Sequence, residues 1–322
     1  MSSKTTKLLG ALFCAFSLSL VAAPTDEKKP DAGKKAAPAP AVKQEVFGSA
    51  QEAGTALIAA AATYDVSRLK SILGLEGVSL VTSEDPVQDR NRATAFAAKA
   101  RAKMSVVIDP KNPNSATLVV GEEDWPAPIP LFKEGKVWRF DSKKGKREIL
   151  YRRVGSNELD AIQICRGYVE AQHEYASKKR DGARVNQYAQ RIISSPGKQD
   201  GLAWRTADGK WEGPVGENIA KAIAEGYHDK MEPYHGYYFK VLKGQGPAAP
   251  LGKLDFVVEG AMIGGFALVA APAEYAVTGV KTFMVSHDGV VWEKDFGAKT
   301  LENFKTMERF NPDKSWSPVE EN

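Results

Sequence analysis

The stretch SNELDAIQICRGYVEAQHEYASK, residues 156–178, has the residue spacing of an amphipathic helix. Ser156 or Asn157 offers a side chain of the kind that caps a helix N-terminus. The side chains that recur every three or four residues and form one broad stripe are Leu159, Ala161, Ile162, Cys165, Tyr168, Val169, Tyr175 and Ala176, with Gln172 among them. Because such a stripe must pack against another layer, the sequence predicts a long helix that covers a sheet.

The residues after this helix alternate as β-strands do. Candidate strands lie at 237–242, 254–258, 265–270, 281–285 and 290–294. The HDG tripeptide at 287–289 separates the last two, and Asp-Gly between alternating strands is the strongest short-range hairpin signal. Short helices are predicted at 215–225 and around Phe304. Residues 151–322 are therefore expected to form one domain, with a long helix on an antiparallel sheet.

The preceding segment, 46–150, has helix signals first and strand signals later. Ser49 and Glu52 form a capping box for one helix, and Asp65 caps a second. Asp85 and the proline after it open a third helix, which runs to about residue 103. A short strand is predicted at 78–81, and further strands at 104–108, 116–120, 129–132 and 137–140. Helices segregated from antiparallel strands indicate an α+β fold class.

The N-terminus has the pattern of a secretory signal peptide, residues 1–23. Lys4 and Lys7 precede an apolar run that is short for a membrane span and ends in small residues. Cleavage is expected after Ala22 or Ala23, and an uncleaved anchor is the alternative. Residues 24–45 are rich in Ala, Pro and Lys and are expected to form a flexible linker. A periplasmic or secreted protein without a membrane span is therefore predicted.

Cysteine content and charge restrict the possibilities further. Cleavage removes Cys14 and leaves Cys165 alone, so an intramolecular disulfide is excluded. The chain is 43% apolar and 26% charged, which is typical of a globular protein rather than a collagenous or disordered one. Its 44 basic and 40 acidic residues give a net charge of +4 and are spread along the chain. No nucleic-acid partner is predicted.

Two parts of the chain resemble known folds. The order of elements in 46–150 resembles the NTF2-like (cystatin-like) cone, in which a curved sheet wraps a helix and leaves a pocket, and WRFD at 138–141 is similar to its strands. The dipeptides NE at 157–158 and AQ at 171–172 resemble the sequence in the head half of a type IV pilin-like helix. This implies a pilin-head fold for 151–322. In pilins the first half of this helix is apolar and lies in the membrane, whereas the corresponding residues here are charged. This argues against incorporation into a filament.

Taken whole, the chain resembles the secreted bacterial family DUF2950. The segments that carry this resemblance lie at 124–130, 138–141, 152–153, 157–159, 171–175, 195–198, 233–238, 262–267 and 287–290. The family has no assigned activity. The resemblance therefore implies export and domain boundaries, and it implies no mechanism.

The densest aromatic stretch of the chain surrounds His235. Its candidate binding residues are Tyr234, His235 and Tyr238, and Trp125 in a proline-rich segment is expected to line or close the cone. A bend at Gly236 would present the first two outward, and strand alternation would bury positions 237, 239 and 241 while leaving 238 and 240 outside. The alternative is that this stretch forms only core and turn.

Catalytic and metal-binding patterns are weak. His228 and His235 with Glu232 or Asp229 match no recurring ligand spacing, so no metal site is predicted. Cys165 lies mid-helix, where nothing lowers a thiol pKa, and is expected to be a buried small residue. Enzymes with the NTF2-like fold use a histidine or aspartate, and 46–150 contains no histidine. No serine-nucleophile or phosphate-binding motif is present, and no cofactor is predicted.

These observations favour an exported, non-catalytic binding or envelope-associated protein with a protein or small-molecule partner in the cell envelope. A hydrolase or isomerase that uses the cone pocket or an inter-domain cleft is one alternative. An accessory factor for pilus or secretion assembly is another, on fold analogy alone. A polar, titratable cluster in the largest pocket would favour an enzyme, whereas an apolar or shallow pocket would favour binding.

Overall fold

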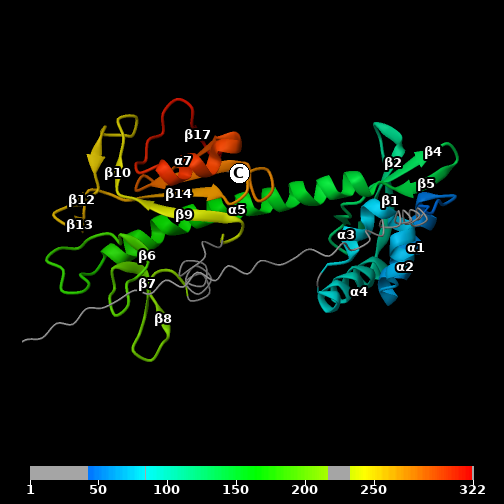
Figure 1. The fold of residues 1–322 in the computed structure, drawn as a ribbon, viewed down its shortest axis with the longest axis horizontal. Helices are drawn as coiled ribbons and strands as arrows, with labels where there is room; N and C mark the ends of the chain where they lie inside the picture. The colour runs from blue at the N-terminus through cyan, green and yellow to red at the C-terminus, as the bar shows by residue number, and fades with distance from the viewer. Residues whose placement is uncertain (1–42, 84, 217–232, 321–322) are drawn as a thin grey trace, which may run out of the picture. The chain divides into compact units, whose positions relative to one another are not determined.

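The computed structural model describes residues 43–83, 85–216 and 233–320 (Figure 1). Their buried side chains form two hydrophobic clusters. One runs from Phe47 to Phe140 and the other from Ala161 to Trp316. No helix among the described residues has the length and apolar character needed to cross a membrane.

The first cluster is built on four α-helices, and the caps predicted for three of them, at Ser49, Asp65 and Asp85, are confirmed. The four helices are α1 (Ala50–Thr63), α2 (Val66–Leu73), α3 (Val78–Val81) and α4 (Pro86–Ala102). Ser49 Oγ accepts from Glu52 N at 3.0 Å, and Asp65 Oδ1 accepts from Arg68 N at 2.9 Å. The strand predicted at 78–81 is wrong, because these residues continue a 3₁₀ turn as the short helix α3. Local hydrogen bonding outweighs the β-propensity of valine there.

An antiparallel sheet completes the first cluster. Its strands are β1 (Met104–Asp109), β2 (Asn112–Val120), β3 (Trp125–Pro126), β4 (Leu131–Glu134) and β5 (Val137–Phe140). The order is β1-β2-β4-β5, with β3 also paired to β2. Gly135 joins β4 to β5 with a φ of 62°, as the hairpin prediction requires. Leu118 and Leu131 project into the cluster and are fully buried.

Helix α5 (Ser142–Ala176) is longer than the sequence predicts. It begins at Ser142 and not at Ser156 or Asn157, because Asp141 accepts from Lys144 N at 2.9 Å and so caps the earlier position. Most of the intervening residues, apart from Gly145 and Gly155, are good helix formers, which explains why the helix continues. Ser142 Oγ donates to Leu73 O at 2.7 Å, which ties this end to the first cluster. The predicted division at residue 150 falls inside α5, and separate folding of the two parts stays a prediction.

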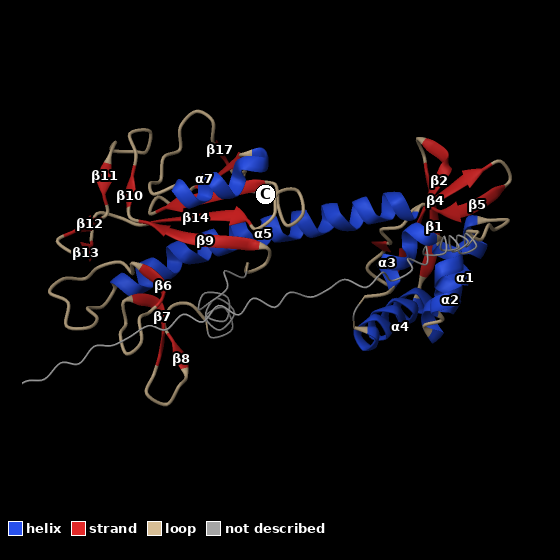
Figure 2. Cartoon of the chain, in the orientation of Figure 1, coloured by secondary structure: helices blue, strands red, loops and turns tan. Residues whose placement is uncertain are grey.

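The second cluster lies around a sheet in the order β17-β16-β15-β14-β9, all antiparallel. The strands are β9 (Tyr237–Leu242), β14 (Ala267–Pro272), β15 (Lys281–Ser286), β16 (Val291–Asp295) and β17 (Ser317–Pro318). Helix α5 packs against β14 and β15, and α7 (Thr300–Thr306) packs against β14 (Figure 2). Gly289, with a φ of 78°, closes the predicted β15–β16 hairpin.

Smaller sheets flank the second cluster. The segment 190–212 holds β6 (Arg191–Ile193), β7 (Gly201–Arg205) and β8 (Trp211–Glu212), with β6 parallel to β7. The pairs β10 (Gly244–Gln245) with β11 (Leu254–Asp255) and β12 (Val257–Val258) with β13 (Ala261–Met262) follow. The strand predicted at 254–258 is divided, because Phe256 turns inward and is fully buried. Most of the helix predicted at 215–225 lies outside the described residues. The fold class is α+β, as predicted.

Candidate functional site

The predicted aromatic site forms a tight turn at the start of β9. The backbones of Tyr234 and Tyr237 exchange two hydrogen bonds, 2.9 and 3.0 Å long. Between them, His235 and Gly236 both have positive φ, 49° and 74°, as in the two-residue turns that join antiparallel strands. His235 is exposed and Tyr234 is half-buried, with 4.4 Å between their ring centres. The bend therefore exposes His235, whereas Tyr234, which was also predicted to point outward, is half-buried against the second cluster.

Helix α5 makes polar contacts with this turn and with the adjacent segment 278–280. His235 Nδ1 lies 2.6 Å from Asp160 Oδ2. Asn157 Nδ2 donates to Thr278 O at 2.8 Å, and a Cβ on Gly236 would come within 2.6 Å of the same nitrogen. Glu158 Oε1 accepts from Val280 N at 2.8 Å. The family-typical segments 157–159 and 233–238 thus meet in space, and glycine is needed at 236.

Tyr238 does not belong to the exposed part of this site, contrary to prediction. Its ring stacks on Phe304 of α7 with 6.3 Å between centres, and it is half-buried. Lys240 Nζ donates to Phe304 O at 2.5 Å, and burial lowers the pKa of Lys240. The alternation rule assumes that one sheet face meets solvent, whereas α7 covers that face. Tyr237 and Phe239 are buried as predicted, but Val241 is only half-buried.

Trp125, the fourth predicted residue, borders a small apolar pocket of about 240 Å³. The pocket lies between α1, α2, α4 and the segment before β4, and it is lined by residues that include Leu57, Leu69, Leu80, Ala93, Phe96, Ile129 and Ile149. The indole of Trp125 is 43% exposed and lies 5.4 Å below the guanidinium carbon of Arg152. Trp125 thus borders a pocket in the first part of the chain, and the prediction that it lines or closes an NTF2-like cone stays a prediction.

Charged groups are few at this apolar pocket. Asp89 and Arg92 are the charged residues in its lining. The carboxylate of Asp89 accepts from Ser83 N at 2.5 Å and from Ser83 Oγ at 2.9 Å. Because both its oxygens are engaged, Asp89 is poorly placed to act as a base. Arg92 has no ion-pair partner among the described residues. The pocket can bury an apolar group, and it offers no acid–base pair.

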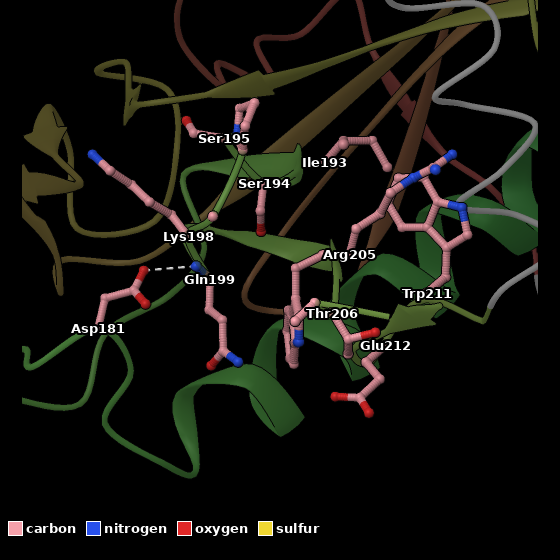
Figure 3. Close-up of a pocket in the computed structure, with 14 residues that line it drawn as sticks. Asp181, Ile193, Ser194, Ser195, Lys198, Gln199, Arg205, Thr206, Trp211 and Glu212 are labelled. Atoms are coloured by element: carbon pink, nitrogen blue, oxygen red, sulfur yellow. Dashed lines mark hydrogen bonds between the residues drawn. The ribbon is translucent and has the colours of Figure 1, made fainter. Parts of the chain in front are cut away.

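A second, larger pocket of about 890 Å³ lies beside β6, β7 and β8 (Figure 3). Arg205, Trp211 and Glu212 lie on one side of it, and Asp181, Lys198 and Gln199 lie on the other, with Ser194 between them (Figure 3). Sequence reasoning missed this site. The one signal was the segment SPGK at 195–198, which was recognised as typical of the family and not as part of a pocket.

The loop 194–200 that forms one wall of the larger pocket is held by its own side chains. Ser195 donates from its backbone N and its Oγ to the two carboxylate oxygens of Asp200, at 2.7 and 2.8 Å. Burial opposes ionisation of Asp200, but these hydrogen bonds and the charge of Arg191 hold its pKa below the usual value. Gln199 N donates to Asp181 Oδ2 at 2.7 Å. The loop is therefore held in place by hydrogen bonds within this part of the chain.

The remaining candidates for catalysis lie apart. Cys165 is fully buried, and burial raises the pKa of its thiol to about 12, so it is not nucleophilic at neutral pH. His287 packs edge-on against Phe256 and Phe266, with centres 6.1 and 6.2 Å away. The β9–β14–β15 register places His235 and His287 at opposite ends of the sheet. His228, Asp229 and Glu232 lie outside the described residues.

Metal ligands do not gather in the part of the chain that the structure describes, since no group of three His, Cys, Asp or Glu side chains there could hold an ion. Searches of the curated proteins and of the solved structures gave no match. The sequence profile of one family, described as protein of unknown function (DUF2950), matches residues 44–319. That range takes in both hydrophobic clusters, the turn at His235 and both pockets, and the chain belongs to the DUF2950 family.

Proposed function

We propose that this chain is an exported, non-catalytic binding protein of the cell envelope, which holds a small apolar ligand in the pocket beside Trp125. The larger pocket is lined by Asp181, Lys198, Arg205 and Glu212, and by the criterion given above such titratable groups favour the enzyme alternative. The observation that carries the binding proposal is the chemistry of the smaller, apolar pocket. Its walls are apolar side chains, and its one carboxylate is already engaged by Ser83. Pockets for small molecules are typically apolar and carry a few placed polar groups. Arg92 at the lining is the group available to orient a ligand.

The proposal includes the two fold resemblances. For 46–150, helices followed by an antiparallel sheet, with an apolar pocket between the helices and the segment before β4, support the NTF2-like cone. For 151–322, a long helix against an antiparallel sheet supports the pilin-head fold. The two proposed folds assign the pocket to the cone and leave the second part as a separate module.

Occupancy of the pocket can be tested with the neutral fluorescent probe N-phenyl-1-naphthylamine. The purified protein is expected to bind it and to increase its emission. Ala93 on α4 lines the pocket, and Ala93→Phe should fill the space and weaken binding at least about tenfold. Ala95 lies on the exposed side of the same helix, so Ala95→Phe is the matched control and should bind as the unchanged protein does. Equal binding by the two variants would contradict the proposed site.

Export is tested separately, by mass spectrometry of the protein from the envelope fraction. The expected N-terminus is Ala23 or Pro24, which results from cleavage after Ala22 or Ala23. An intact Met1, or a lipid on Cys14, would exclude the released form of the protein.

A further inference from the structure

Unpartnered polar side chains surround the larger pocket beside β7 and β8 (Figure 3). The amide of Gln199, the guanidinium of Arg205 and the carboxylate of Glu212 form no hydrogen bond with any residue that the structure describes. Each of these groups is planar and presents two polar atoms side by side. Together they supply both donors and acceptors. A ligand with adjacent hydroxyl groups could satisfy them in pairs.

The charges at this pocket balance. Lys198 and Arg205 are positive, and Asp181 and Glu212 are negative. Asp181 already accepts from Gln199 N at 2.7 Å. Because neither sign prevails, the pocket does not favour an ion of one charge, and a neutral polar ligand suits it best.

Two tryptophans add aromatic surface to the polar groups. Trp211 is half-buried and stacks with the guanidinium of Arg205, whose carbon lies 4.9 Å from the ring centre. Trp204 also lines the pocket, and Arg180 lies between the rings of Trp204 and Tyr175, 4.7 Å from each centre. These stacked pairs fix the positions of the indoles. The exposed part of the half-buried Trp211 ring can bury the C–H groups of a ring whose rim is polar.

The pocket is also ordered in advance and of suitable size. The Ser195–Asp200 hydrogen bonds hold the loop, and Gly201 N donates to Ser194 Oγ at 2.9 Å. A wall that is already ordered loses less conformational entropy when a ligand binds. The volume of about 890 Å³ lies within the usual range of small-molecule sites, roughly 300–1,000 Å³. More than one sugar ring fits in such a space.

We propose that the pocket formed by Ser194, Gln199, Arg205, Trp211 and Glu212 is a binding site for a neutral saccharide. The site is distinct from the apolar pocket beside Trp125 and does not depend on it. Rings with apolar C–H faces and vicinal hydroxyl groups match its aromatic and planar polar groups. Binding there involves no covalent step.

The test is isothermal titration calorimetry of the full protein with four neutral disaccharides: maltose, cellobiose, lactose and N,N′-diacetylchitobiose. At least one should bind with a dissociation constant of about 1 mM or below. Gln199→Ala and Glu212→Gln should each weaken that binding about tenfold, because each removes hydrogen bonds to hydroxyl groups. Gln51→Ala and Glu302→Gln make the same chemical changes on exposed helix faces and should leave binding unchanged.

Three outcomes would overturn this assignment. None of the four disaccharides binds, or binding is unchanged in both pocket variants while circular dichroism shows them folded. The third is that inorganic phosphate binds in this pocket and displaces the sugar, which would identify an anion site. The variant Ala93→Phe should retain disaccharide binding, so failure here and failure of the apolar-pocket proposal are distinguishable.

Discussion

The two halves of α5 belong to one continuous helix, but the first half is mostly exposed and the second half is largely buried. In the first half only Ser142 and Gly145 are buried, while Tyr151 is 65% exposed. The second half buries six side chains: Ala161, Cys165, Tyr168, Ala171, Gln172 and Tyr175. An apolar stripe therefore marks only that part of a helix which packs along its length against a core. Where a helix is mostly exposed, capping and helix propensity must identify it.

The first half is stabilised locally. Asp141 caps it, and Glu148 and Arg152 form an i,i+4 ion pair at 2.8 Å. The second half is stabilised by burial against the second cluster. Even a polar side chain of this half, Gln172, is fully enclosed. Its amide is fully buried, donating to Ala189 O and accepting from Ala189 N, each at 2.8 Å. Substitutions in the two halves should therefore have very different effects on the free energy of unfolding.

The largest difference is expected between two tyrosines of this helix. Tyr168→Ala removes a ring that is 5% exposed and packs against Phe266, and it should lower the free energy of unfolding by about 3–5 kcal/mol. Tyr151→Ala should change it by less than about 0.5 kcal/mol. Urea denaturation followed by circular dichroism measures both. Similar losses in the two variants would show that the halves are not stabilised differently.

Two glycines of α5 give a second, smaller comparison. A Cβ at Gly145 would come within 2.8 Å of the Ile129 side chain and 3.1 Å of its Cα, so Gly145→Ala should destabilise by about 1–3 kcal/mol. A Cβ at Gly155 would meet nothing within 4 Å, so Gly155→Ala should stabilise by about 0.5–1 kcal/mol through helix propensity. Thermal unfolding of the two variants should therefore shift in opposite directions. A shift in the same direction would mean that α5 does not approach Ile129 closely.

A modest effect on stability is expected at the turn that α5 contacts. The double variant Tyr234→Ala, His235→Ala should stay folded and lose about 1–2 kcal/mol, because Tyr234 is only half-buried against the second cluster. The His235–Asp160 pair adds little to this loss, since its side chains are 45% and 41% exposed. We expect the same variant to capture less partner from an envelope extract. The matched control is Tyr151→Ala, His173→Ala, at two exposed positions of α5. Unfolding of the first variant would show that the turn serves the core alone.

Much of the fold follows from local signals in the sequence. The caps at Ser49, Asp65 and Asp85 act within three residues, so the starts of α1, α2 and α4 could be predicted correctly. The hairpin at Gly289 has a similarly local cause. The start of α5 was missed because its exposed turns have no stripe. The predicted strand at 78–81 was wrong because β-propensity needs a neighbouring strand to be realised.

The candidate sites depend on contacts that no local pattern contains. The sequence by itself determined the turn chemistry at Gly236, the burial of Cys165 and the α+β class, because spacing and residue type decide these. The tertiary structure alone decided that α7 covers Tyr238, that Asp160 meets His235 across 75 positions, and that 194–200 faces Trp211. Such contacts depend on how elements that are distant in the sequence pack together. The packing energy that stabilises them comes from many residues of both clusters, so no short segment of the sequence predicts them.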